Sequence, residues 1–192
     1  MSQVTADCTT VPLTEEVAHV RFPEVVDRFR QRTLLSGAGV LQPRFAIFDG
    51  AWVAKRRQST MNSGVWLPKD DGGIMLEEQV QGDQLDVNAV VGWDGRVCRV
   101  WPAVLEVWSP FGNRITKYIS TSLICSRVWL QRIATGLGLR GCGLNVEFRE
   151  TRNGPCVIEA HARLGEDVDN DYYAKWAGEE NPFEVLIDEL GT

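Results

Sequence analysis

Two glutamates, a histidine and an arginine near the C-terminal end of the sequence have the types and spacing of a cation and phosphate site. Glu147 lies in one short segment of alternating apolar and polar residues, and Glu159, His161 and Arg163 occupy every second position of the next such segment. Because successive side chains of a β-strand point to opposite faces, the last three share one face. Carboxylate oxygens suit Mg²⁺, and a guanidinium can hold a phosphate or stabilise a phosphoryl group in transfer. The pattern therefore indicates a hairpin that brings a metal ion and a phosphate together.

The loop between the two segments decides whether the glutamates meet. A three-residue loop over 152–154 pairs Glu147 with Glu159 and Phe148 with Ile158, which keeps both apolar sets on one face. A two-residue Asn-Gly loop would send the two apolar sets to opposite faces, so the pattern favours the longer loop. Directly opposed side chains have Cβ atoms about 4.5–5.5 Å apart, and two carboxylates at that distance repel each other. A divalent cation would relieve this repulsion.

A solvated polar face is the alternative interpretation of the same hairpin. Glu159 would then pair with Arg163 or Arg149, as exposed charges on a hairpin often do. Spacing alone favours this simpler interpretation, so the metal site depends on what the rest of the sequence adds.

Helices and strands elsewhere in the sequence must hold this hairpin in place. We predict an α+β fold, in which helices pack on an antiparallel sheet. Apolar periodicity and turn dipeptides predict these elements: a helix over 22–37, short strands over 45–48 and 52–55, strands over 85–93 and 97–108, a helix over 122–137, the hairpin over 143–164 and a short helix over 182–190.

Composition and charge narrow the classes of function. The chain has 192 residues with 20 Lys and Arg against 26 Asp and Glu, a net charge of −6, which argues against binding to nucleic acids or to anionic membranes. The start of the sequence has no basic segment followed by an apolar one, so we expect no secretory signal. The five cysteines contain no CxxC motif, which favours reduced thiols in a cytoplasmic protein over a zinc site or a disulfide framework.

The hairpin and several upstream segments resemble the ATP-grasp superfamily, and more narrowly its amino-acid ligase (carboxylate–amine ligase) branch. The resemblance covers about residues 25–190 and is strongest in the hairpin. The segments that carry it are Asn145-Val146-Glu147-Phe148, Gly154-Pro155, Ile158-Glu159-Ala160-His161-Ala162-Arg163-Leu164-Gly165, Lys55 with the Ser- and Gly-containing stretch 59–65, Leu76-Glu77-Glu78-Gln79-Val80-Gln81-Gly82, and the entry stretch 27–43.

The resemblance implies a ligase that uses ATP to phosphorylate a carboxylate, giving an acyl phosphate that an amine attacks. The cofactors would be ATP and Mg²⁺, and the substrates a small-molecule carboxylate and amine. By this resemblance the metal ligands would be Glu147, Glu159 and His161; Arg163 and Lys55 would act in catalysis; and the nucleotide would contact Lys55, Ser59, Ser63, Gly64, Glu77, Glu78, Gln79 and Val80.

The same resemblance suggests how the chain is divided. We expect an N-terminal tail over 1–21 and a single compact domain over 22–192. Within that domain, residues 22–73 would form a small subdomain with the phosphate loop, and residues 74–192 would carry the metal and nucleotide site. The small size of the chain makes a homodimer or a partner protein that completes the site plausible.

Two functions from different classes follow. The first is the ligase, which is favoured by the intact set Glu147, Glu159 and Arg163. The second is a non-catalytic ATP-grasp module that binds a nucleotide, a metabolite or a partner protein. It is favoured by departures from the family pattern, which commonly has Asn at the position of His161 and Glu at that of Gln84.

Overall fold

The computed structural model describes residues 15–45, 52–56, 74–108, 115–121, 123, 125–165 and 178–191. Its main element is a six-stranded sheet in the order β6-β5-β3-β7-β8, with β4 paired to β3 and all pairs antiparallel. These strands are β3 (Gln84–Val91), β4 (Val97–Val100), β5 (Val104–Trp108), β6 (Ile115–Ser120), β7 (Cys142–Thr151) and β8 (Gly154–His161). A separate two-stranded sheet pairs β1 (Trp52–Arg56) with β2 (Ile74–Glu78).

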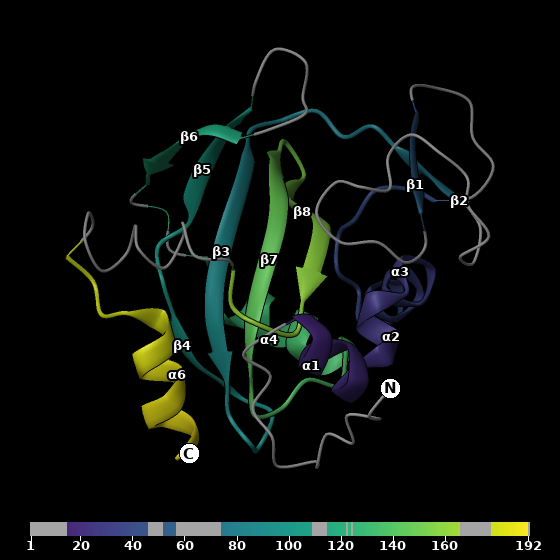
Figure 1. Cartoon of the computed structure of the whole chain (residues 1–192). Coiled ribbons are helices and arrows are strands. Elements are labelled where there is room, and N and C mark those ends of the chain that lie inside the picture. Colours follow the sequence, from purple (N-terminus) through teal and green to yellow (C-terminus); the bar gives the residue numbers. More distant parts are fainter. Residues whose placement is uncertain are drawn as a thin grey trace.

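Helices surround the large sheet. They are α1 (Glu15–Arg21), α2 (Pro23–Val26), α3 (Arg28–Gly37), α4 (Arg127–Gly136) and α6 (Pro182–Leu190). The first three lie beside the β8 edge, α4 lies behind the sheet, and α6 lies in front of β4 (Figure 1). The predicted α+β class, an antiparallel sheet with packed helices, is confirmed.

The two faces of the central strands have opposite character. One face packs against α4, whose Leu130, Ile133 and Ala134 are buried in the same core. The fully buried strand residues on this face include Val87, Ala89, Leu144, Val146 and Phe148. The other face carries polar side chains, which include buried Asp86, Asn88 and Asn145. Alternation along each strand therefore separates a hydrophobic core from a polar surface on which a site can form.

At one end, the polar face of the sheet is closed by a smaller apolar cluster. Val90 of β3 packs there with Trp101, Leu164 and Leu186, the last of which belongs to α6. The polar surface is thereby limited to the part of β3, β7 and β8 beyond that cluster.

The outer edge of β8 is held by α3 through side chains rather than by another strand. Gln31 donates to the carbonyl of Ala160 at 2.7 Å and accepts from its N–H at 3.3 Å. Arg32 donates from Nη1 to the carbonyl of Val157 at 3.2 Å and from Nη2 to that of Ile158. An edge strand otherwise presents unpaired polar groups, so these contacts complete the sheet.

Arg32 also joins the two sheets. Its Nε donates to the carboxylate of Glu77 on β2, and both side chains are only 2% exposed. A buried charge requires a paired and hydrogen-bonded partner. The guanidinium thus fixes the small sheet to the edge of the large one.

Several expected elements differ from those observed. The helix expected over 22–37 is broken at Asp27, whose extended backbone and side-chain acceptance from the N–H groups of Phe29 and Arg30 start a new helix. The helix expected from residue 122 begins at Arg127. The strand expected over 97–108 is divided into β4 and β5 by the stretch 101–103, where Trp101 is buried.

Residues 15–21, expected to belong to a tail, form α1. Ala18 is buried, and Arg21 donates to the carbonyls of Gly141 and Arg140 at 2.8 Å each. The Arg21 guanidinium also lies 4.9 Å from the centroid of the Trp93 ring. These partners are far along the chain, so local periodicity did not indicate them.

The small sheet contains residues from both sides of the subdomain boundary expected after residue 73, because β2 pairs with β1. Of the strand expected over 45–48, Phe45 forms a single bridge with Glu77, and the remainder lies outside the described residues.

Replacing Arg32 should destabilise the protein strongly. Arg32→Met removes the guanidinium from beside a buried carboxylate and two buried carbonyls, so we expect the free energy of unfolding to fall by about 3–5 kcal/mol in urea denaturation. Arg44→Met is the matched control. Arg44 pairs with Glu78, the next residue of β2, but these side chains are 64% and 39% exposed, and we expect a much smaller loss. Similar losses in the two variants would contradict this assignment.

Candidate metal site

The pairing of β7 with β8 places Glu147 directly opposite Glu159, as predicted. The route to this register differs from the prediction. Thr151 pairs with Gly154, so the loop has two residues, and Phe148 faces Val157 rather than Ile158. The ladder shifts between Glu147 and Phe148, which leaves Ile158 as the extra residue of a β-bulge. The bulge restores the alternation that the short loop would otherwise have inverted.

The Ile158 bulge is held from outside the sheet. Its carbonyl accepts from Arg32, and the next residue, Glu159, forms an ion pair with Arg28 at 2.7 Å. Arg28 and Arg32 lie one turn apart on the same helix, so they lie on the same side of it. Helix α3 therefore holds both the backbone of the bulge and the carboxylate of Glu159.

Glu147, Glu159 and His161 form a compact group on the polar face. His161 Nε2 lies 3.9 Å from Glu147 Oε1 and 3.7 Å from Glu159 Oε1. One ligand atom from each of the three lies within 4.8 Å of the others. Ligands of one Mg²⁺ ion lie about 3 Å apart when adjacent and about 4.2 Å apart when opposite. Small side-chain rotations would therefore bring all three onto a single ion, and the residues fit a divalent cation.

The group is partly shielded from solvent. The side chains of Glu147, Glu159 and His161 are 27%, 15% and 18% exposed. This exposure leaves a way in for an ion and a phosphate, while the reduced contact with water strengthens their attraction to the carboxylates.

A second set of contacts holds Glu147. Gln84 donates from Nε2 to Glu147 Oε2 at 3.3 Å and to Glu106 Oε2 at 2.9 Å. Arg149 donates to Gln84 Oε1 at 2.9 Å and to the carbonyl of Gly82 at 2.6 Å. Because its amide hydrogens are directed at two carboxylates, Gln84 fixes the orientation of the Glu147 side chain.

The polar face extends across three strands in two rows. Asp86 of β3 lies opposite Glu147, so Asp86, Glu147 and Glu159 form one row. Asn88, Asn145 and His161 form the next row. Asn145 donates from Nδ2 to the side chains of Asp86 and Asn88, both of which are buried.

Sequence reasoning did not assign Arg28, Asp86 or Glu106 to the site. The alternation of polar residues along β3 indicated a polar face. Nothing local showed that this face lies beside the carboxylates of the hairpin.

The other predicted residues fall in three places. Arg163 lies two residues beyond β8 and donates to the carbonyl of Leu164 at 2.8 Å. Lys55 lies in β1 opposite Met75, and Ser59, Ser63 and Gly64 lie outside the described residues. The roles of Arg163, Lys55 and the loop remain predictions.

The predicted adenine-contacting segment divides into buried and exposed residues. The carboxylate of Glu77 faces inward to Arg32. Glu78 faces outward, and the hydrogen bond from Arg44 lowers the pKa of its carboxyl. Gln79 and Val80 follow β2, exposed and half-buried respectively. The side chain of Glu77 is therefore engaged by Arg32, and the contacts of this segment with a nucleotide remain a prediction.

The described cysteines are unsuited to nucleophilic chemistry. Burial raises the pKa of Cys125 and Cys142 to about 12 and that of Cys156 to about 11. Such thiols stay protonated at neutral pH.

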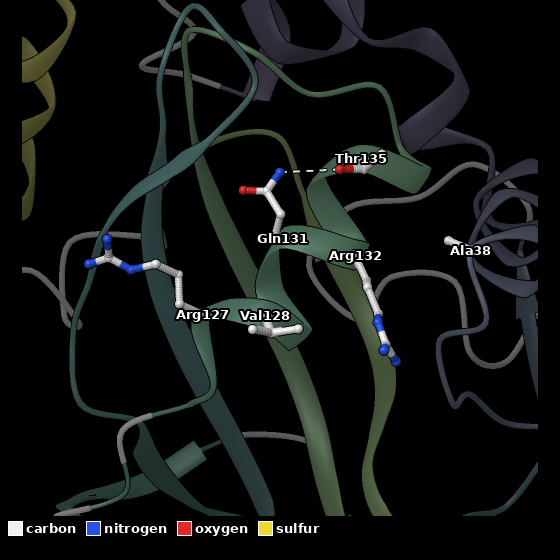
Figure 2. A pocket seen from close by; sticks show the side chains of 6 residues that line it. All are labelled: Ala38, Arg127, Val128, Gln131, Arg132 and Thr135. Carbon is white, nitrogen blue, oxygen red and sulfur yellow. Dashed lines mark hydrogen bonds between the residues drawn. The ribbon is translucent and has the colours of Figure 1, made fainter.

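A hollow of about 510 Å³ lies along α4 (Figure 2). It is lined by Ala38, Arg127, Val128, Gln131, Arg132 and Thr135. Because α4 packs on the apolar face of the sheet, this hollow and the candidate metal site are on opposite sides of the strands.

No helix within the described ranges has the length and apolar character needed to cross a membrane.

Comparison with solved structures shows the fold. An ATP-grasp superfamily protein from Archaeoglobus fulgidus matches with a TM-score of 0.66 and 17% identity, over 90% of this chain and 55% of that one. L-amino acid ligase from Bacillus licheniformis matches with a TM-score of 0.66 and 17% identity, over 92% and 52%. D-alanine–D-alanine ligase from Bacillus anthracis matches with a TM-score of 0.63 and 12% identity, over 91% and 69%.

These likenesses show that the chain has the ATP-grasp fold, as the sequence resemblance predicted. The chain spans about half the length of the first two of these structures. No family model and no curated protein matches the sequence.

Removing Arg28 should make the protein's stability more dependent on a divalent cation. In Arg28→Met, the opposed carboxylates lose a neighbouring positive charge, and we expect a loss of about 1–3 kcal/mol in EDTA. Millimolar MgCl₂ should raise the melting temperature of this variant more than that of the wild type, because an ion replaces the lost charge.

Arg30→Met is the control for Arg28→Met. Arg30 lies on the same helix but pairs with exposed Glu24, away from the site. The stability of this variant should change much less than that of Arg28→Met, with no added response to MgCl₂. Equal responses to MgCl₂ in the wild type and Arg28→Met would contradict cation binding at the carboxylates.

Proposed function

We propose that the protein is an ATP- and Mg²⁺-dependent ligase that activates a carboxylate as an acyl phosphate for attack by an amine. The observation that carries the proposal is the direct opposition of Glu147 and Glu159, on an accessible polar face of an ATP-grasp fold. Opposed carboxylates repel each other, and a metal ion between them would relieve the repulsion that remains beside Arg28.

The proposed chemistry has two steps. A carboxylate oxygen of the substrate attacks the γ-phosphorus of ATP, which breaks the bond to the bridging oxygen and releases ADP. The amine nitrogen then attacks the acyl carbon, and inorganic phosphate leaves. A phosphoryl transfer of this kind depends mainly on positioning and on neutralisation of charge.

The residues of this chain would supply that positioning. Glu147, Glu159 and His161 would hold Mg²⁺, which neutralises phosphate charge when bound. Arg163 would stabilise the transferring phosphoryl group, and Lys55 would contact phosphate beneath the loop that contains Ser59, Ser63 and Gly64. Backbone groups and side chains over Glu78–Val80 would hold the adenine and ribose, with Glu77 fixing β2 through Arg32.

A non-catalytic ATP-grasp module is the second candidate function. It is favoured by the ion pair between Arg28 and Glu159, which already offsets one carboxylate. It is also favoured by coverage, since the chain spans only 52% of the solved L-amino acid ligase that it resembles. Such a module would bind a nucleotide, a metabolite or a partner protein without turnover.

A thermal-shift titration with ATP tests the nucleotide site. We expect ATP with MgCl₂ to raise the melting temperature more than ATP or MgCl₂ alone, because a ligand that binds only the folded state stabilises it. Glu147→Gln should remove most of the Mg²⁺-dependent part of the shift. Glu180→Gln is the control, because this glutamate is exposed and pairs with Arg99.

ADP release then separates the two functions. Release that requires both a carboxylate and an amine, and that falls at least about a hundredfold in Glu147→Gln, is the result expected for a ligase. A Mg²⁺-dependent thermal shift without ADP release across a panel of carboxylates and amines would favour the non-catalytic module. The absence of any shift at millimolar ATP would overturn both nucleotide functions.

A further inference from the structure

A histidine nitrogen lies close to both of the opposed carboxylates of the candidate metal site. His161 pairs with Asn145, one position along from the Glu147–Glu159 pair, on the same face of the sheet. Its Nε2 is nearly equidistant from the two carboxylate oxygens, at 3.9 and 3.7 Å. These separations exceed hydrogen-bond distance, so Nε2 is directed at both carboxylates without donating to either of the two oxygens.

We infer that His161 makes this a mixed nitrogen and oxygen site that prefers a first-row transition-metal dication, with Mn²⁺ as its test ion, over Mg²⁺. The inference deepens the proposed function and rests on its metal site, because it names the ion that the same carboxylates would hold.

The chemistry of the donor atoms supports this preference. Mg²⁺ is a hard ion that takes oxygen ligands and gives up its water reluctantly, so exchanging a water oxygen for an imidazole nitrogen gains it little. First-row transition ions accept imidazole readily, and Mn²⁺ also suits carboxylate and water ligands. A set of two carboxylates and one imidazole therefore favours Mn²⁺.

Neighbouring side chains contact both carboxylates of the candidate metal site. Arg28 contacts Glu159 at 2.7 Å, and Gln84 donates to Glu147 at 3.3 Å. Both carboxylates are therefore already engaged by a neighbouring side chain. A ligand that binds strongly through nitrogen adds most where the oxygen donors are partly engaged.

The test measures metal binding by the full chain without nucleotide, whose adenine nitrogens would complicate the spectra. Electron paramagnetic resonance follows the loss of the free Mn²⁺ signal, and competition with MgCl₂ gives the ratio of affinities. We expect Mn²⁺ to bind at least about tenfold more tightly than Mg²⁺. Electron spin echo modulation should show ¹⁴N coupling to bound Mn²⁺.

Two variants make the inference falsifiable. His161→Asn replaces the imidazole by an amide that can offer oxygen, and should remove the ¹⁴N coupling and reduce the Mn²⁺ to Mg²⁺ ratio several-fold. Glu147→Gln should weaken both ions while leaving a nitrogen donor in place. Near-ultraviolet circular dichroism of each variant establishes that it is folded.

The outcomes separate this inference from the proposed function. An affinity ratio near one, or a ratio and ¹⁴N coupling unchanged in His161→Asn, would overturn the role of His161 and leave the ligase proposal intact. Failure of the wild type to bind either ion alone would also overturn it, and the thermal shift with ATP and MgCl₂ would then judge the ligase independently. Selective Mn²⁺ binding without any response to ATP would support the metal preference and count against the ligase.

Discussion

The contact between helix α3 and the outer edge of β8 is the constraint on which the site depends. Arg32 is buried, and its charge is matched by the carboxylate of Glu77 and by two strand carbonyls. A guanidinium carries five donors in a rigid fork, so it can satisfy a carboxylate and adjacent carbonyls at once. One of those carbonyls belongs to Ile158, the residue of the bulge. The same interaction that joins the two sheets therefore stabilises the irregularity that sets the register of the site.

That register has an electrostatic cost that the neighbouring residues offset. Glu147 and Glu159 are opposed, and Asp86 extends the row on β3. Arg28 offsets the charge of Glu159. Gln84 donates one hydrogen bond to Glu106 and one to Glu147. Residues that violate local rules for stability tend to occur at functional sites, where the fold compensates for them elsewhere. The compensation here comes from α3 and β3, which are distant from β8 in the sequence.

The sequence predicted correctly the pairing that depends on local alternation of apolar residues. It did not predict the features that depend on a residue far along the chain. The Glu147–Glu159 pair was predicted correctly because apolar alternation requires both apolar sets on one face. The loop was wrong because a bulge can restore that alternation as well as an extra loop residue can, and the bulge depends on Arg32, more than a hundred positions away. The break at Asp27 carried a visible capping signal, whereas α1 depends on Arg21 reaching the carbonyls of Gly141 and Arg140. Arg28 and Glu106 could not be assigned to the site from the sequence. Their positions depend on the packing of α3 against β8 and on the order of the strands.

The position of Arg163 shows how closely the site depends on a single small residue. Past the end of β8, the chain at Arg163 and Leu164 passes directly over Gly143 of β7, where an added Cβ atom would lie 2.5 Å from the backbone nitrogen of Leu164. The added atom would also lie 2.8 Å from the backbone carbonyl carbon of Arg163, so rotation of the Leu164 side chain could not relieve the clash. The lack of a side chain at Gly143 lets the chain continue over β7, with Leu164 in the apolar cluster beneath α6 and Arg163 one residue before it. Among the described residues, α6 closes that end of the face and α4 covers the other face, so the carboxylates face the polar surface of β3, β7 and β8.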